Sequence, residues 1–307
     1  MVGTTTGIQP HVALAVDSRC TLGESIVWCD REQVLWWTDI KGKRIWRAGI
    51  GDRTGQWWST QGRVGSLALC ESGRLLLGME RALYFADPRQ HEPGSALTCE
   101  LLAEVPMEGA SMRINDGRVD RSGNFVFGGI NEAASKSRLA CFHQFSLEHG
   151  LRPLALEPVT IANGIAFDPS GRQMYYCDSL QGRIMKVGYD AALAQVGAVE
   201  VFATVDVDAE PDGAMVDGHG RLWGAQWGAG RVVRYSATGE VDLVVPVPAT
   251  QPTCVTFGGA GQDALFITSA RDGLDDAQLG AQPTSGGVFA AALDAPHATA
   301  SCRFMDS

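Results

Sequence analysis

The sequence predicts an all-β protein, a six-bladed β-propeller with a central channel. The 307-residue chain contains 37 glycines and 8 tryptophans among many short runs of alternating apolar residues, a pattern typical of strands joined by tight turns. A unit of apolar strand, turn and second apolar strand recurs along the whole chain. The units are evenly spaced, and no long helical periodicity interrupts them.

The repeated units predict the six blades in chain order. They are SIVWCDREQVLWWTD (25–39), SLALCESGRLLLGME (66–80), GRVDRSGNFVFGGI (117–130), GIAFDPSGRQMYYCD (164–178), GAMVDGHGRLWGAQW (213–227) and CVTFGGAGQDALFITS (254–269). Their turns open at Asp30, Glu71, Asp120, Asp168, Asp217 and Gly258, so successive turns are 41, 49, 48, 49 and 41 residues apart. A period of roughly 40–50 residues is typical of propeller blades with four strands. A β-sandwich with similar hairpins is the alternative, and the even spacing disfavours it.

The two ends of the chain are expected to close the ring together. The early run HVALAVDS (11–18) reads as one more strand, which would complete the blade begun by CVTFGG (254–259) and GGVFAAAL (286–293). No low-complexity linker divides the pattern. We therefore expect a single domain over residues 1–307.

Composition excludes several classes of partner. The formal net charge of -10 and pI near 5.1 argue against nucleic acid. No apolar run approaches the ~18 residues of a membrane helix, so no membrane partner is expected. The eight cysteines contain no C-x-x-C pair and are expected to be reduced thiols. With no signal peptide evident, we expect a cytoplasmic protein. A monomer is expected, although the sequence does not determine the oligomeric state.

Equivalent positions of the repeats are expected to meet at one mouth of the channel, because the inner strand of each blade lines it. Counting five residues back from each turn reaches only polar residues, namely Ser25, Ser66, Asn115, Asn163, Asp212 and Thr253. For any one of them, an ordinary solvated turn is the competing interpretation. Several such side chains at one mouth favour a binding site.

This ring predicts a site for one divalent metal cation. Glu24, Asn163 and Asp212 offer hard oxygen ligands, which suit Ca²⁺, Mg²⁺, Mn²⁺, Zn²⁺ or Fe²⁺ without distinguishing them. Without a cation, the two carboxylates would repel each other. Glu24 lies one residue out of register with the ring, so a β-bulge or its longer side chain must compensate.

Other motifs for catalysis or metal binding are absent from the sequence. It contains no G-x-S-x-G, G-x-x-x-x-G-K-[ST] or G-x-G-x-x-G motif, and no H-E-x-x-H. The run DAEPDG (208–213) faintly resembles an EF-hand loop. His219 would then occupy the twelfth position, where such a loop requires a bidentate Glu, so we reject that interpretation.

The same segments resemble the gluconolactonase family, also called the senescence marker protein 30 or regucalcin family. The matching segments are TLGESIVW (21–28), RINDGRVDRSGNF (113–125), IANGIAFDPSG (161–171), EPDGAMVDGHGRLWGAQWG (210–228), and TSARDGL (268–274) followed by SGGVFA (285–290). They occur in order over about residues 21 to 290, and the last of them look most like the bacterial sugar-lactonase branch.

The resemblance implies a six-bladed propeller with one divalent cation at the channel mouth. The metal-binding Glu, Asn and Asp of the family match Glu24 in L-G-E, Asn163 in A-N-G and Asp212 in P-D-G. The implied activity is hydrolysis of sugar-acid lactones, of five or six carbons, to aldonic acids. A small-molecule sugar lactone is therefore the expected partner.

Substrate-binding residues are implied by the same resemblance. Those of the R-x-N-D-G motif fall on Arg113, Asn115 and Asp116. Relatives also carry an acidic residue on a loop over the site, for which Glu132 in GGINEAAS is the candidate. Arg113 has no basic equivalent at its position in the other repeats, which independently favours a substrate contact. Its alternative role is a salt bridge to Asp116 or Glu132.

The sequence leaves the catalytic role of Asp212 and part of the function open. Asp212 could hold the metal and also accept a proton from the attacking water, or it could act as a ligand only. A metal-binding protein without important catalysis is a second hypothesis for the whole chain. A propeller scaffold for protein interactions is a third.

Overall fold

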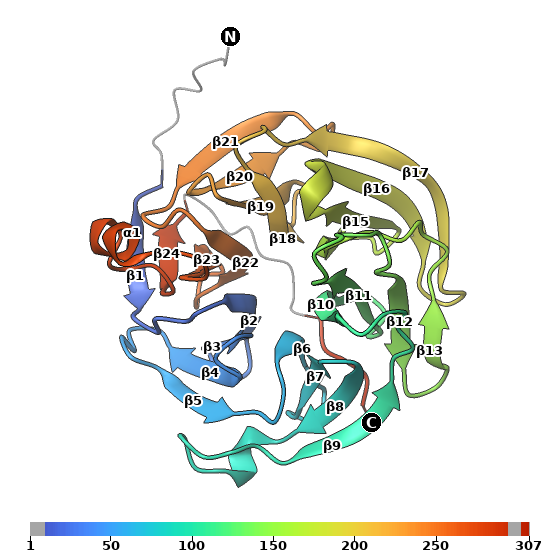
Figure 1. The fold of residues 1–307 in the computed structure, drawn as a ribbon, viewed down its shortest axis with the longest axis horizontal. Coiled ribbons are helices and arrows are strands. Elements are labelled where there is room, and N and C mark those ends of the chain that lie inside the picture. Colours follow the sequence, from blue (N-terminus) through green and yellow to red (C-terminus); the bar gives the residue numbers. More distant parts are fainter. Residues whose placement is uncertain (1–9, 294–301, 307) are drawn as a thin grey trace.

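Six four-stranded antiparallel sheets surround a common centre, as the predicted propeller requires (Figure 1). The computed structural model describes residues 10–293 and 302–306. The first strand of each blade lies nearest the centre. These inner strands are β2 (Gly23–Cys29), β6 (Val64–Leu69), β10 (Met112–Val119), β14 (Ala162–Phe167), β18 (Glu210–Val216) and β22 (Pro252–Gly258). The all-β, six-bladed prediction is confirmed.

The remaining strands follow outward in each blade. The second strands are β3 (Val34–Asp39), β7 (Leu75–Met79), β11 (Phe125–Asn131), β15 (Gln173–Asp178), β19 (Leu222–Trp227) and β23 (Ala264–Ser269). The third strands are β4 (Arg44–Gly49), β8 (Ala82–Ala86), β12 (Phe142–Ser146), β16 (Arg183–Asp190), β20 (Arg231–Tyr235) and β24 (Val288–Ala292). The outer strands are β5 (Gln56–Ser59), β9 (Cys99–Glu104), β13 (Gly150–Pro153), β17 (Gln195–Thr204), β21 (Val241–Pro246) and β1 (Val12–Val16).

The ring closes as the sequence predicts, with β1 as the outer strand of the sixth blade. Val12 pairs with Ala291 and Leu14 with Phe289 in an antiparallel ladder. The first and last strands of the propeller therefore lie in one sheet, so the ring cannot open without breaking this ladder. Helical structure is limited to α1 (Asp276–Ala281) and two short 3₁₀ turns, η1 (Pro88–Gln90) and η2 (Ser179–Gln181).

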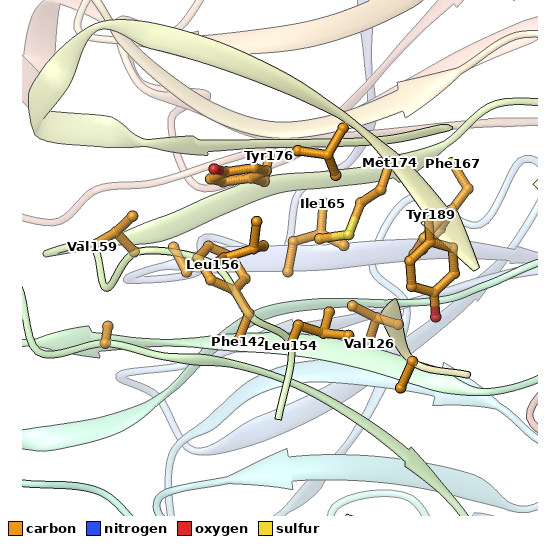
Figure 2. Packing of buried hydrophobic residues seen from close by; sticks show 14 of the residues in the cluster. Val126, Phe142, Leu154, Leu156, Val159, Ile165, Phe167, Met174, Tyr176 and Tyr189 are labelled. Atoms are coloured by element: carbon orange, nitrogen blue, oxygen red, sulfur yellow. The ribbon is translucent and has the colours of Figure 1, made fainter. Parts of the chain in front are cut away.

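The hydrophobic core lies between neighbouring blades rather than at the centre. Between the third and fourth blades, Val126 and Phe142 face Ile165, Met174 and Tyr176 (Figure 2). Each fully buried side chain of this size contributes about 1.5–3 kcal/mol. Because the two faces of every sheet pack against neighbours, the inner strands are held rigidly while their first residues border the channel.

A β-bulge interrupts each inner strand near the polar ring. The pairing register shifts between Glu24 and Val27 in β2 and between Asn163 and Ala166 in β14, and corresponding shifts occur in the other four blades. Ser25 has a positive φ of 52° in its bulge. A bulge changes the side on which the following residues project. Glu24 and Asn163 are each the last paired residue before the bulge, so they occupy equivalent ladder positions despite the one-residue offset counted from the turns.

The C-terminal segment Cys302–Asp306 lies at the other end of the channel, beside the hairpin turns. Phe304 is fully buried, and its backbone N–H donates to the Leu69 carbonyl at 2.8 Å. Its own carbonyl accepts from Glu71, and Met305 donates to the Gly123 carbonyl. This segment joins the second and third blades, and nothing in the repeat pattern predicts it.

Two expectations concern the chain as a whole. All eight cysteines are unpaired thiols, as expected. Among the residues of ranges 10–293 and 302–306, no helix is long and apolar enough to cross a bilayer. The single domain over 1–307 stays a prediction, because its ends lie outside the described residues.

Candidate functional site

The six ring positions lie in the inner strands, and some of their side chains form hydrogen bonds to the neighbouring blade. Each is at least nine-tenths buried. Asn115 donates from Nδ2 to Asn163 Oδ1 at 3.0 Å, which links the third and fourth blades. Ser25 Oγ accepts from the Leu67 backbone N–H at 2.9 Å, which links the first blade to the second. The polar ring is thus a physical cluster around the channel.

Asp212 of this ring and Glu24, which precedes the ring residue Ser25, carry carboxyl groups that interact electrostatically and accept few hydrogen bonds. Burial raises the pKa of Glu24 to about 8, and the nearby charge of Asp116 adds to this effect. Burial and then the charges of Glu24 and Asp116 hold the pKa of Asp212 well above its usual range. Neither carboxyl group can readily ionise here without a compensating positive charge.

The hydrogen bonds of these groups leave their oxygens largely available. Asp212 Oδ1 accepts from the Gly213 N–H at 3.0 Å, and Glu24 Oε2 accepts from the Ser25 N–H at 3.1 Å. Asn163 donates from Nδ2 to Ser179 Oγ at 2.9 Å, which turns its amide oxygen toward the ring. That oxygen accepts one bond from Asn115 and keeps a second lone pair.

This donor set fits a hard divalent cation. Among the described residues, no three His, Cys, Asp or Glu side chains are grouped so that they could hold a metal ion. A cation would therefore need the amide oxygen of Asn163 and water besides Glu24 and Asp212, a mixture that Ca²⁺ or Mg²⁺ accepts. Its charge would also offset the burial and the neighbouring negative charges that raise the pKa of both carboxyl groups.

Asp116 lies in strand β10 rather than in a turn. Its Oδ2 accepts from the Ile165 backbone N–H at 2.7 Å, which ties the third blade to the fourth. Burial raises its pKa, although Arg118 and this N–H oppose the shift. Asp116 therefore has a structural role that the sequence did not indicate, and a substrate contact stays a prediction for it.

Arg113 and Glu132 meet at the channel mouth. Arg113 Nε donates to Glu132 Oε1 at 3.0 Å, and its Nη1 donates to Asn115 Oδ1 at 2.8 Å. The Arg113 side chain is only 4% exposed, while that of Glu132 is 30% exposed. The salt bridge to Glu132, one of the two alternatives from the sequence, is thus formed. It places Glu132 beside the candidate substrate residues.

Two further arginines belong to this region, and the sequence analysis missed both. Arg63 contacts Glu132 and Glu80 at the mouth. Arg118 lies in the channel and donates to the carbonyls of Ile165 at 3.0 Å and Ala214 at 2.9 Å. Arg118 could have been noticed inside RINDGR. Arg63 precedes the turn of its own repeat by one residue more than Arg113 does. Counting back from the turns therefore does not place the two arginines at equivalent positions.

Comparisons with known proteins agree with the resemblance found in the sequence. Residues 22–271 match the family described as the SMP-30/Gluconolactonase/LRE-like region. An L-arabinolactonase of Azospirillum brasilense is 41% identical over 286 residues, covering 92% of this chain and 91% of that protein. A 6-deoxy-6-sulfogluconolactonase of Pseudomonas putida is 31% identical over 277 residues, covering 90% and 92%.

A solved structure shares the architecture over nearly the whole chain. It is the crystal structure of a calcium-binding protein, regucalcin, from Agrobacterium tumefaciens. The two chains superpose with a TM-score of 0.86 at 25% identity, covering 96% of this chain and 98% of that one.

Proposed function

The chain belongs to the SMP-30/gluconolactonase family, and we propose that it is a sugar lactonase that uses one divalent cation to open sugar-acid lactones to aldonic acids. The cation would be held by Glu24, Asn163 and Asp212 at the channel mouth. Arg113, Asn115 and Glu132 would border the substrate beside it.

One observation supports this proposal above the others. Glu24 and the buried Asp212 lie close enough for the charge of Glu24 to raise the pKa of Asp212, and desolvation raises the pKa of both carboxyl groups. Stability alone disfavours such a pair, because desolvated like charges cost free energy without a partner. A bound cation would supply the missing positive charge. Carboxyl groups with perturbed pKa values at a channel mouth are typical of functional sites.

The chemistry assigned to the site is hydrolysis of an ester within a ring. A bound divalent cation would polarise the lactone carbonyl and lower the pKa of water. Asp212, ionised beside the cation, would accept a proton as the water oxygen adds to the carbonyl carbon. The ring C–O bond then breaks, and that proton passes to the leaving alkoxide, so that lactone and water give one hydroxy acid. Arg113 would donate to an oxygen of the substrate.

The relatives suggest where to search for the substrate. Proteins named L-arabinolactonase and 6-deoxy-6-sulfogluconolactonase resemble this chain over about nine-tenths of its length. The former has the higher identity of the two, so we propose a five-carbon aldonolactone as the first substrate to test. Six-carbon lactones form the comparison set.

A pH-indicator assay with pentono- and hexonolactones tests the proposal. Purified protein should release acid faster than the spontaneous rate, lose this activity when dialysed against a chelator, and regain it with a divalent cation. Cation binding without acid release from any lactone would instead support a metal-binding protein without catalysis. Activity that persists after complete removal of metal would overturn the cation's role.

A substitution separates the two roles of Asp212. Asp212→Asn keeps a ligand oxygen but removes the proton acceptor. If the variant still binds the cation and retains full activity, Asp212 is a ligand only. If it binds the cation but loses activity, Asp212 is also the proton acceptor.

A further inference from the structure

Four charged residues form a chain of ion pairs along the channel mouth. Glu80 binds Arg63, Arg63 binds Glu132, and Glu132 binds Arg113, so that negative and positive groups alternate. We refer to these four residues as the mouth relay. Glu80 and Arg63 belong to the second blade, whereas Glu132 and Arg113 belong to the third. The relay therefore crosses the boundary between two blades at the edge of the candidate site.

Arg63 lies at the centre of the relay. Its Nε and Nη2 each donate to a carboxylate oxygen of Glu80 at 2.9 Å, a bidentate pair. Its Nη1 donates to both oxygens of Glu132, at 2.9 and 3.1 Å. The guanidinium group is thus fully engaged by protein. Such fork-shaped pairing fixes direction as well as distance, and a lysine could not reproduce it.

The backbone holds the start of the relay firmly. Glu80 adopts a positive φ of 48°, a conformation that non-glycine residues seldom adopt. Its N–H donates to the Arg63 carbonyl at 3.0 Å, and its own carbonyl accepts from the Ile114 N–H at 2.7 Å. Glu80 is therefore fixed both to Arg63 and to the residue that follows Arg113. A residue kept in this region needs support from its surroundings, which these bonds provide.

Arg113 keeps one donor free at the end of the relay. Its Nε is used by Glu132, and its Nη1 by Asn115 and the Ile114 carbonyl. Its Nη2 donates to no acceptor among the described residues and is not sealed from solvent. The rest of the side chain is buried. A guanidinium group held on two nitrogens presents the third in a fixed direction.

We propose that Arg63 is a positioning residue of the lactonase, which acts through Glu132 to aim Nη2 of Arg113 at an oxygen of the substrate. Glu132 then serves to orient Arg113, because its oxygens already accept three hydrogen bonds from two arginines. This inference rests on the proposed lactonase function. It adds Arg63 and Glu80, which touch no reacting atom, to the residues on which the rate depends.

The test is a double-mutant cycle on lactone hydrolysis with Arg63→Met and Arg113→Met. Losing an orienting residue typically lowers activity about 10–100-fold. Arg63→Met should therefore reduce kcat/KM by a factor within those limits. Once Arg113 is absent, Arg63 has nothing left to position. The double variant should then be no slower than Arg113→Met alone, whereas independent effects would multiply. Arg63→Lys should fall between wild type and Arg63→Met.

A matched control separates positioning from general damage. Arg47 pairs with Glu32 at 3.2 Å, and the two side chains are 31% and 38% exposed. Arg63 and Glu80 are 30% and 39% exposed, so the pairs are similarly exposed. Arg47 lies on the third strand of the first blade. Arg47→Met should therefore leave kcat/KM unchanged. Cation affinity, measured by calorimetry, should stay at the wild-type value in Arg63→Met and in Arg47→Met.

The outcomes distinguish this inference from the proposed function. If wild-type protein hydrolyses no lactone, the proposed function fails. If wild type is active and the two losses multiply, or if Arg63→Met matches Arg47→Met, the inference fails while the function stands. A weakened cation affinity in Arg63→Met would also overturn it, because the damage would then have reached the cation ligands.

Discussion

The same repeats place acidic residues at both ends of the channel, and the two groups have opposite surroundings. We call Asp120 and Asp217, which open hairpin turns, the turn acids, and Glu24, Asp116 and Asp212 the mouth acids. Asp217 accepts from the backbone N–H groups of His219 at 2.9 Å and Arg221 at 3.0 Å. It also accepts from Arg221 Nε at 2.8 Å and Trp223 Nε1 at 3.0 Å.

The number of donors explains the difference in ionisation. Burial alone would raise the pKa of Asp217, but the bonds from Trp223 and Arg221 outweigh it and lower the pKa. Asp212 is also buried but accepts only one backbone N–H, so desolvation and the neighbouring acids raise its pKa. The fold supplies donors where a carboxylate stabilises a turn and withholds them at the candidate cation site. Unsatisfied acids, rather than buried acids as such, mark the functional end.

The largest expected effect comes from Asp212→Asn at the mouth. Loss of a general base lowers rates about 10²–10⁴-fold, and we expect kcat/KM to fall within that range. The melting temperature of the metal-free variant should equal or exceed that of wild type, because a neutral amide replaces a carboxyl group that ionises less readily in the folded state than in the unfolded state. Initial rates and thermal melts measure both quantities. An active variant, or one that melts well below wild type, would contradict the assignment.

A second prediction concerns pH. Unfolded carboxyl groups ionise near 4.3, whereas Glu24 in the folded, metal-free protein stays protonated up to about 8. Between these values only the unfolded state loses the proton, so the unfolding free energy should fall as pH rises, by up to about 1.4 kcal/mol per pH unit for each such group. Urea unfolding in chelator at several pH values tests this. Stability that rises from pH 5 to 8 would refute it.

The turn acids should respond in the opposite way to mutation. Asp217→Ala leaves several buried donors without an acceptor, and hydrogen bonds to charged groups contribute about 1.5–3 kcal/mol. We expect a loss of that order in the unfolding free energy, with kcat of the folded protein unchanged. Denaturant unfolding measures the free energy of unfolding, and rates divided by the concentration of folded protein give kcat. If Asp217→Ala lost kcat while keeping wild-type stability, the turn acids would not differ in role from the mouth acids, and the prediction would be wrong.

The smallest effect is expected at Asp168, a turn position that is partly exposed. Its Oδ1 accepts from the backbone N–H groups of Arg172 and Gln173, both at 2.9 Å. Water can replace these bonds in part, so Asp168→Ala should cost about 0.5–1.5 kcal/mol. The comparison with Asp217→Ala measures how much burial strengthens the same kind of turn. Equal losses at the two positions would show that burial is not the controlling factor.

The sequence predicts the architecture well because repetition carries the information. Spacing of the turns places Asn163 and Asp212 at equivalent positions, and ring closure by residues 12–16 follows from the incomplete last blade. Counted from the turn at Asp30, Glu24 is one residue out of register, yet it precedes the bulge of β2 as Asn163 precedes that of β14. The structure supplies the conformation of the β2 bulge, a positive φ at Ser25.

Features specific to one blade could not be predicted in this way. The pairing of Arg63 with Glu132 joins residues 69 positions apart on different blades, and no repeat position marks either. The same holds for Phe304, which pairs with the second blade from the far end of the chain. Such contacts depend on how particular side chains meet, which a period of 40–50 residues does not encode.

Calorimetric titration of metal-stripped protein with Ca²⁺ or Mn²⁺ tests the central claim most directly. We predict one equivalent of cation per chain in wild type. Binding should release protons near pH 7, because the pair of Glu24 and Asp212 must ionise to hold the cation. Asp212→Asn should weaken binding, and Asp217→Asn should not. No binding to wild type, or equal binding to wild type and Asp212→Asn, would contradict a cation site at the mouth.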